Sequence, residues 1–478
     1  MSSLNDYLSI VRSNTNFSFQ AYAPSANCVN SSKKKLSDIA LTSLSIVILL
    51  IVVAYCIYYL FAIRTGAQIR DEFGGFLVIG AIGIWRWSVL LINLVRCVFY
   101  LIVFYPRRKK KANYYFTNFI HPPLAIVMPT FKEEPSITRE VVASIVAEAK
   151  TLLRPVYFAV VSTESELAAI SVLITLLDPT KQYIKFIPVL DPNSGKRGAL
   201  NLGLQSLQKY NFSTNGIIAL MDGDSVVDKN TFKRALGCFM SNPKLGALTT
   251  NEIPVCAGPA WFSTWLDLRF MQRHLYMCSY ALTNRIMCLT GRFSFFQANL
   301  ILGEEFQNQL VNDMLSDWLW GDFKFFSGDD KTSWFYIASK GWQMSYLPDI
   351  NVKTIEVIKG FGLSRAYQNM RRWSGNMLRN GTRALSISPS LLGPYLWLGV
   401  LDQRFSMWTA LISPSLLIIA LIHRDFYVVT ILVVWILLSR SVYVLSLYFS
   451  YRLCPLNVAQ VPILLASQWS NALVKIFT

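Results

Sequence analysis

Residues 124–133 read Leu-Ala-Ile-Val-Met-Pro-Thr-Phe-Lys-Glu, an apolar run that ends in polar residues. Similar β-rich runs follow at 157–161, 184–188 and 217–221, and segments with a helical pattern lie between them, as at 137–153 and 165–177. Strand-like runs that alternate with helical segments indicate an α/β domain with a parallel sheet. Such sheets bind ligands beyond the carboxyl ends of their strands, so the polar residues after each run are the first candidates for a site.

The composition indicates a membrane protein. The chain of 478 residues is 53% hydrophobic and 15% charged, whereas soluble domains have about 25% charged residues. Apolar segments at about 39–63, 76–105, 405–422, 426–449 and 461–477 predict five membrane spans. The expected organisation is a polar cytoplasmic N-terminus (1–35), two transmembrane helices (36–105), a cytosolic catalytic domain (106–360), amphipathic interfacial helices (361–392) and C-terminal transmembrane helices (393–478).

The formal net charge of +17 fits a membrane protein, because some of the basic residues lie in short runs beside the apolar segments. A basic run at 107–111 follows the second apolar segment, which places the next domain in the cytosol under the positive-inside rule. Binding to nucleic acid is therefore not expected. Arg86, Arg96 and Arg440 interrupt apolar segments, where an arginine facing lipid is costly. They either contact an anionic polymer, or they pair with groups at helix ends or extend their charged ends toward the membrane interface.

Two motifs are candidates for binding an anionic nucleotide ligand. Thr130, Phe131 and Glu133 follow the first apolar run, where Thr130 and Phe131 can border a base ring and Glu133 can accept a hydrogen bond from it. Lys196 and Arg197 stand between glycines before a helical segment, and a helix N-terminus with two cations favours negative charge. The competing interpretations are an ordinary strand-end loop and a solvated basic turn.

Two pairs of aspartates are candidates for chemistry. Asp222 and Asp224 follow the run at 217–221, and carboxylates in such a turn suit Mg²⁺ or Mn²⁺, which can bridge a diphosphate. Asp329 and Asp330 follow Gly328 after an apolar and aromatic run (Phe323, Phe325, Phe326), and a carboxylate delivered into a cleft can take a proton from a hydroxyl nucleophile. Both pairs are also compatible with simple turns.

The segment Gln368-Asn-Met-Arg-Arg-Trp373 is the last candidate motif for the site. A pair of guanidinium groups can clamp a pyrophosphate, and the indole of Trp373 can support the apolar face of a sugar. A basic helix at the membrane interface is the competing interpretation.

In this order, the motifs resemble those of the family-2 processive glycosyltransferases, which include the cellulose, chitin, hyaluronan and alginate synthases. The similarity covers about residues 75–478, and long phrases such as Leu268–Ser279 and Gly328–Phe335 resemble the alginate synthases most. It implies an α/β GT-A domain with a mostly parallel sheet, inserted between transmembrane helices of a multi-pass protein. One departure concerns Gln368, which stands one residue too far from Arg372 and Trp373, so either Asn369 takes its place or the helix is shifted.

The resemblance also implies roles for residues. Asp222 and Asp224 would hold the metal on the diphosphate of a GDP- or UDP-linked sugar, with Lys196, Arg197 and Arg372 at phosphate oxygens. Asp330 would be the general base, supported by Asp329, and Trp373, Gly291 and Arg292 would bind the acceptor. A uronate carboxylate needs a cation, for which Arg269, Arg273, His274, Arg292 and Lys331 are candidates.

The predicted function is inverting, processive synthesis of a β-linked polysaccharide that crosses the membrane, with β-1,4-mannuronan from GDP-mannuronate as the first choice. A cellulose-, chitin- or hyaluronan-type synthase that uses UDP-sugars is the alternative within the class. The competing classes are a non-processive, lipid-linked sugar transferase and a polysaccharide channel without catalysis. The predicted partners are the nucleotide sugar, the growing polysaccharide and the lipid bilayer, and the sequence identifies no regulatory or export partner.

Overall fold

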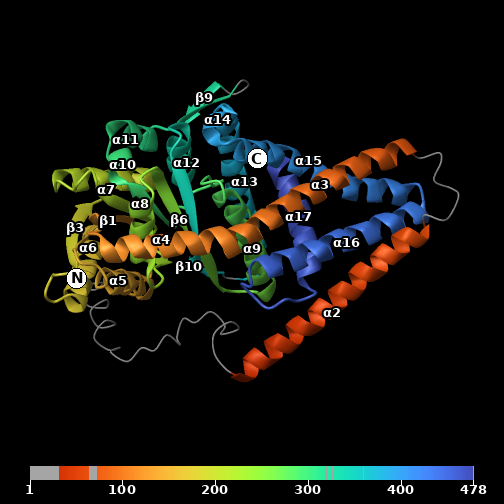
Figure 1. Cartoon of the computed structure of the whole chain (residues 1–478), viewed down its shortest axis with the longest axis horizontal. Helices are drawn as coiled ribbons and strands as arrows, with labels where there is room; N and C mark the ends of the chain where they lie inside the picture. The colour runs from red at the N-terminus through yellow and green to blue at the C-terminus, as the bar shows by residue number, and fades with distance from the viewer. Residues whose placement is uncertain (1–31, 64–72, 318–320, 325–327, 359, 477–478) are drawn as a thin grey trace.

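The computed structural model describes residues 32–63, 73–317, 321–324, 328–358 and 360–476 (Figure 1). The polar N-terminus up to residue 31, the loop at 64–72, and Phe325, Phe326 and Ser327 before the second aspartate pair lie outside the described residues.

The centre of the α/β domain is an eight-stranded sheet of order β3-β2-β1-β4-β7-β6-β10-β5. The pairs β3–β2, β2–β1, β1–β4 and β6–β10 are parallel, whereas β7 and β5 run antiparallel to their neighbours. The sheet is thus mostly parallel, as predicted. Its strands are β1 (Leu124–Pro129), β2 (Val156–Ser162), β3 (Ile184–Leu190), β4 (Ile217–Met221), β5 (Ser225–Val226), β6 (Leu245–Ala257), β7 (Phe293–Gln297) and β10 (Gln343–Val357).

Helices connect the strands where the sequence pattern placed them. The predicted segments 137–153 and 165–177 correspond to α5 (Pro135–Ala149) and α6 (Glu164–Leu177), and Pro135 occupies the first turn of α5, where a missing N–H costs nothing. The apolar residues of β1 and β4 are buried because helices cover the sheet. The other elements of the domain are α7 (Gly195–Lys209), α8 (Thr231–Ser241), α9 (Ala260–Ala281), α10 (Ala298–Ile301), α11 (Glu304–Val311), the hairpin β8 (Met314–Asp317) and β9 (Gly321–Lys324), and α12 (Asp329–Ser339).

The strand order determines where a ligand site can form. The chain moves outward from β1 to β2 and β3 and then returns to place β4 on the other side of β1. The crevice at such a reversal, beyond the carboxyl ends of the strands, is where open α/β sheets bind ligands. Thr130 follows β1 and Asp222 follows β4, so the topology brings these two motifs together.

Outside the sheet, four helical segments in the described residues are long and apolar enough to cross a membrane: Ser37–Leu60, Gly80–Asn118, Pro394–Ile422 and Phe426–Ser450. They belong to α2 (Ser32–Ile63), to α3 with its continuation, to α15 (Pro394–Ile422) and to α16 (Phe426–Ser450). The fifth expected span corresponds to α17 (Gln460–Ile476), which has 17 residues and is not among the four. The predicted interfacial helices are α13 (Leu363–Leu385) and the short α14 (Pro389–Leu392).

One continuous helical rod joins the apolar helices to the α/β domain. It consists of α3 (Phe73–Phe99), a π-helical segment (Tyr100–Phe104) and α4 (Tyr105–Asn118), with no break between them. Figure 1 shows this orange rod running diagonally from the apolar helices to the sheet. The α3 part packs against α9 and the α4 part packs against α8, so the rod contacts helices of the α/β domain along its length.

A buried carboxylate connects three helices around the second aspartate pair. Asp313 is 3% exposed, and its two oxygens lie 2.8 and 2.9 Å from Nη1 of Arg383 on α13. It also accepts a hydrogen bond from Thr332 on α12, and its Oδ2 lies 3.8 Å from Nη1 of Arg197 on α7. Asp313 therefore fixes α12 relative to α7 and α13.

We expect Asp313→Asn to lower the apparent melting temperature of the detergent-solubilised protein markedly, because two buried guanidinium groups would lose their carboxylate. Removing one partner of a buried ion pair costs about 3–5 kcal/mol. Glu305→Gln is the matched control, since the Glu305 side chain is 65% exposed in its pair with Lys340 and such pairs contribute about 0–1 kcal/mol. Equal melting temperatures for the two variants would contradict the role assigned to Asp313.

Candidate active site

A single cavity of about 1490 Å³ contains nearly all the residues predicted for the site. Its lining comes from the ends of β1 and β4, the start of α7, the loop at 290–292, the start of α12 and one face of α13. It continues to side chains of α3, α9, α15 and α17. The site therefore opens from the sheet edge toward the apolar helices. The predicted site residues in the lining are Thr130, Phe131, Glu133, Lys196, Asp222, Asp224, Gly291, Arg292, Asp329, Asp330, Arg372 and Trp373.

The loops after β1 and β4 are in close contact. The Thr130 N–H donates to the carbonyl of Val161 at 3.0 Å, which holds the turn after β1. A β-carbon at Gly223 would lie 2.8 Å from Oγ1 of Thr130, so only glycine fits between Asp222 and Asp224 without a shift. Phe131 is 54% exposed at the cavity edge, where it can border a flat ring.

Three carboxylates gather at this edge of the sheet: Glu133, Asp222 and Asp224. Burial, together with the negative charges of Asp224 and Asp222, raises the pKa of Glu133 above its usual range. The excess of negative charge favours a bound cation. No group of three or more such side chains in metal-binding geometry occurs within the described ranges. Mg²⁺, however, commonly binds to one or two carboxylates and completes its shell with phosphate oxygens and water, which fits Asp222 and Asp224.

Lys196 joins the two aspartate pairs. Its Nζ lies 2.8 Å from Oδ1 of Asp222 and 3.2 Å from Oδ2 of Asp329. Burial opposes the charged form, but the carboxylates of Asp329 and Asp222 outweigh it and raise the pKa of Lys196. Lys196 therefore keeps its positive charge between Asp222, which follows β4, and Asp329, which begins α12.

Arg197 points in another direction from Lys196. Its guanidinium donates to the carbonyl of Leu310 at 2.9 Å and to Oγ1 of Thr332 at 3.0 Å, and it is not part of the cavity lining. The structure thus brings Lys196 to the site and uses Arg197 to hold α7 against α11 and α12. The motif gave no sign of this difference, because the helical turn alone decides which of two adjacent side chains faces the cavity.

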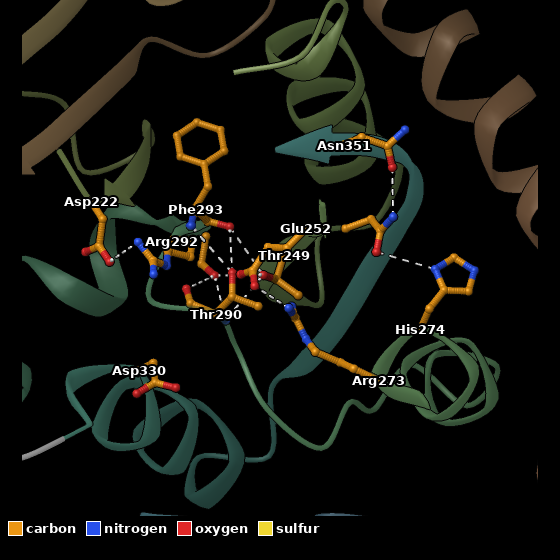
Figure 2. Close-up of polar contacts among 12 residues, drawn as sticks. Asp222, Thr249, Glu252, Arg273, His274, Thr290, Arg292, Phe293, Asp330 and Asn351 are labelled. Carbon is orange, nitrogen blue, oxygen red and sulfur yellow. Dashed lines mark hydrogen bonds and ion pairs between the residues drawn. The ribbon is translucent and has the colours of Figure 1, made fainter. Parts of the chain in front are cut away.

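Arg292 contacts the aspartates that were predicted to hold the metal. It donates to Oδ2 of Asp224, and its Nη1 lies 3.9 Å from Oδ2 of Asp222. Figure 2 shows Arg292 reaching toward Asp222, with Asp330 on the neighbouring α12. Arg292 was predicted to bind the acceptor, and in this structure it neutralises the carboxylates at the end of β4. A metal ion at Asp224 would therefore compete with Arg292 for this carboxylate or bind its other oxygen.

Hydroxyl groups hold the loop that carries Gly291 and Arg292. Oγ1 of Thr249 lies 2.9 Å from Oγ1 of Thr290 (Figure 2). Ser294 donates to the carbonyl of Thr290 at 2.7 Å. A β-carbon at Gly291 would lie 3.4 Å from Nζ of Lys196 and 3.7 Å from Cβ of Asp330. The backbone of Gly291 thus forms one wall beside the second aspartate pair.

Asp329 and Asp330 form the first turn of α12, which begins after Gly328 in the left-handed conformation (φ 89°). Negative charge is favourable at a helix N-terminus. Burial disfavours ionisation of Asp330, but the ammonium of Lys331, 3.0 Å from its Oδ2, outweighs burial and lowers the pKa of Asp330. Asp330 is therefore an ionised carboxylate at neutral pH, and its ion pair with Lys331 makes it a weaker base than a free aspartate.

The α13 helix presents Arg372 and Trp373 to the cavity. Trp373 stacks on buried Trp265 with ring centroids 5.9 Å apart and planes 13° from parallel, which leaves its other face for a ligand. Asn369 is one turn earlier and donates to Glu356 at 3.2 Å, whereas exposed Gln368 donates to Ser364. Asn369 is three residues before Arg372 and four before Trp373, so the prediction that Asn369 takes the place of the glutamine stays compatible with α13.

The predicted carboxylate-binding cations separate into two groups. Arg273 pairs with Glu252 (Figure 2), and His274 is buried against Tyr346 and Tyr451, so neither is available as it stands. Arg269 lines the cavity and donates to Oε1 of Gln272 at 3.3 Å.

Of the three arginines in apolar segments, Arg86 lines the cavity and pairs with Asp402 at 2.6 Å. Arg96 donates to the carbonyl of Ser279, and neither Arg96 nor Arg440 lines the cavity.

Sequence reasoning missed Asp402 and Lys475, which also line the cavity. Each is a charged residue in a mostly apolar helix, Asp402 in α15, which also contains Arg404, and Lys475 in α17. Ionisable residues in such segments often mark a ligand path. This signal was present in the sequence and would have identified both.

Comparison with known proteins agrees with these motifs. Residues 121–376 match the family model described as glycosyltransferase like family 2. A protein named Glycosyltransferase alg8 from Pseudomonas syringae pv. tomato is 32% identical over 405 residues, which is 84% of this chain and 81% of that protein. Its namesake from Azotobacter vinelandii is 31% identical over 403 residues, with the same coverage of both chains. A mannosyltransferase from Pyrobaculum calidifontis, solved with GDP-mannose and Mn²⁺, is 14% identical and covers 84% of this chain and 99% of its own, with a TM-score of 0.44 that is too low to support an inference.

The family match includes the sheet, α12 and the part of α13 that carries Arg372 and Trp373. The predicted fold class, an α/β GT-A domain between apolar helices, is confirmed, and the chain is an enzyme that transfers sugars. This protein belongs to the family-2 glycosyltransferases.

Proposed function

We propose that this enzyme polymerises a uronic-acid sugar from a nucleotide-linked donor, with GDP-mannuronate as donor and β-1,4-mannuronan as product. The main support is the shared cavity, which contains both aspartate pairs and Trp373 and continues to α3 and α15. A transferase that releases a short product has no need of a path from its catalytic carboxylates to apolar helices. The likeness of long sequence phrases to alginate synthases supports the choice of donor.

The donor lies at the crevice between β1 and β4. Thr130, Phe131 and Glu133 border the base, and Lys196 and Arg372 contact phosphate oxygens. Asp224, with Asp222, would hold Mg²⁺ or Mn²⁺, and this ion would supply charge stabilisation for the departing diphosphate. Arg292 contributes a further positive charge for the phosphates or the acceptor.

Asp330 removes the proton from the acceptor hydroxyl as its oxygen attacks the anomeric carbon. The new C–O bond forms on the face opposite the diphosphate, the bond to the diphosphate oxygen breaks, and the nucleoside diphosphate leaves with both bonding electrons. The configuration inverts, so an α-linked donor gives a β-linked product. Lys331 keeps Asp330 ionised, and Asp329 orients Lys196 through their ion pair.

The acceptor sugar stacks on the free face of Trp373, and the product continues through the cavity between the apolar helices. In this arrangement the protein crosses the membrane several times, and the catalytic domain lies in the cytosol, where nucleotide sugars occur. The basic run at 107–111 supports this orientation. The domain boundaries at 35, 105, 360 and 392 are part of the same proposal.

The test is incubation of the purified protein with Mg²⁺ or Mn²⁺ and a panel of GDP- and UDP-linked sugars. We expect nucleotide release only with the GDP-uronate, together with a polymer that a mannuronate-specific lyase degrades. Turnover of a neutral UDP-sugar would instead favour a cellulose- or chitin-type synthase. Release with no product longer than one added sugar would favour a non-processive transferase.

Trp373→Ala should shorten the product and reduce polymer yield roughly tenfold or more, since an aromatic stacking contact is worth about 0.5–1.5 kcal/mol beyond the area it buries. Donor hydrolysis should change little, because Trp373 lies on the acceptor side. Trp373→Phe should restore most of the polymer length on a gel. Full-length polymer from Trp373→Ala would exclude the stacking role.

A further inference from the structure

Two cations in the cavity, Arg269 on α9 and Lys475 on α17, have no carboxylate partner among the described residues. Other lining cations are paired, for example Arg273 with Glu252 and Lys331 with Asp330. Arg269 has only an amide oxygen within hydrogen-bond distance, that of Gln272 at 3.3 Å. An uncompensated charge in a partly buried place is costly, so an anionic ligand is the natural partner for both.

A third cation strengthens this excess of positive charge. Arg86, Arg269 and Lys475 all line the same cavity, on α3, α9 and α17. Of these three cations, Arg86 pairs with an acid, Asp402, whose two oxygens lie 2.6 and 3.3 Å from the Arg86 guanidinium. Asp402 is thus already neutralised, and the charge of Arg269 and Lys475 is left for a ligand.

The position of α17 is fixed by a polar contact. Asn471, one turn before Lys475, also lines the cavity and accepts a hydrogen bond from Ser374 on α13 at 2.7 Å. Ser374 is next to Trp373, the proposed acceptor platform. The same contact therefore connects the helix that carries Lys475 to the helix that carries Trp373.

The surroundings favour a sugar polymer over a lipid. The lining of the same cavity includes Trp85, Tyr276 and Phe405, whose rings can pack on sugar faces, and Gln403, whose amide can bond to hydroxyl groups. The cations also lie in the same cavity as Asp330 and Trp373, so a chain that leaves the catalytic centre meets them.

We propose that Arg269 and Lys475 form a carboxylate-binding subsite for the growing polymer, beyond the acceptor platform. This subsite selects a chain that carries carboxylates over a neutral chain of the same linkage. The inference rests on the proposed function, because it presumes that the product passes through this cavity.

The experiment measures binding of a β-1,4-linked mannuronate hexamer and of its carboxyl-reduced, neutral counterpart to the full-length protein in an uncharged detergent. We expect the charged hexamer to bind at least about tenfold more tightly, since hydrogen bonds between ionised groups are roughly twice as strong as neutral ones. Arg269→Gln and Lys475→Gln should each remove most of this preference and leave affinity for the neutral hexamer unchanged.

Two further variants serve as controls. Lys229→Gln removes the same charge from an exposed position outside the cavity and should behave as the unmodified protein. Arg269→Lys keeps the charge and should retain most of the preference. Nucleotide binding, measured in every variant, shows that the domain is folded, so a loss of hexamer binding is then specific to the subsite.

Equal binding of the two hexamers, or an unchanged preference in both glutamine variants, would overturn the subsite even if the enzyme turns over a GDP-uronate. Loss of bound anionic phospholipid in those variants, with hexamer binding intact, would make the cluster a lipid site and also overturn it. Failure of every uronate donor in the turnover assay would count against the proposed function instead, and a charge-dependent hexamer preference would still support the subsite.

Discussion

Asp330→Asn is expected to reduce sugar transfer by at least roughly 1000-fold, within the range of about 10²–10⁴ that a general base contributes. The amide has nearly the same shape as the carboxylate but cannot take the proton of the acceptor hydroxyl. Polymer formation from the preferred donor, followed by radiolabel incorporation, is the measurement.

Binding of the nucleoside diphosphate should be unchanged in this variant, because Asp330 lies at the start of α12 and not at the ends of β1 and β4. Asp329→Asn removes the same charge one residue earlier, where it contacts Lys196, and should cost less. Turnover by Asp330→Asn within about tenfold of the unmodified enzyme would remove Asp330 from the proposed role.

Asp224→Ala is expected to abolish the dependence of donor binding on Mg²⁺ or Mn²⁺ and to slow transfer by roughly 100- to 1000-fold, the cost of losing one element of charge stabilisation at the leaving group. Calorimetric titration of donor with and without metal measures the first effect. Glu305→Gln, an exposed acid far in sequence from both aspartate pairs, should leave both quantities unchanged.

A complication at Asp224 makes this test informative. Arg292 already donates to one oxygen of this carboxylate, so a metal ion would either share Asp224 with a guanidinium or displace it. Asp224→Ala frees Arg292 as well as removing a ligand. Donor binding that stays metal-dependent in this variant would place the ion elsewhere in the cavity and contradict the assignment.

The local elements and the order of motifs could be predicted from the sequence. Each of β1 to β4 is a short apolar run, and Thr130 and Asp222 stand directly after two of them, so their positions at the sheet edge follow from strand polarity alone. The second aspartate pair was expected to reach a cleft, and it begins α12 and lines the cavity. These features depend on residues that are close in sequence.

What could not be predicted depends on contacts between distant residues. The insertion of antiparallel β7 between β4 and β6 brings Arg292 to Asp224, and no pattern near residue 292 indicates this partner. Likewise, Arg197 and Arg383 meet at Asp313 because three helices converge there. Adjacent cations such as Lys196 and Arg197 look equivalent in a sequence, and only the fold decides which one faces the cavity.

The unbroken rod from Phe73 to Asn118 has a mechanical consequence. Its π-helical turn leads directly into Pro106, so the helix continues past a residue that would otherwise interrupt it. The rod contains no loop, and α8 and α9 pack against it on the side of the α/β domain. This packing is expected to limit tilting of the α/β domain relative to α3. If the enzyme polymerises as proposed, we expect the product to advance through local side-chain movements, such as that of Arg292, rather than through tilting of the domain.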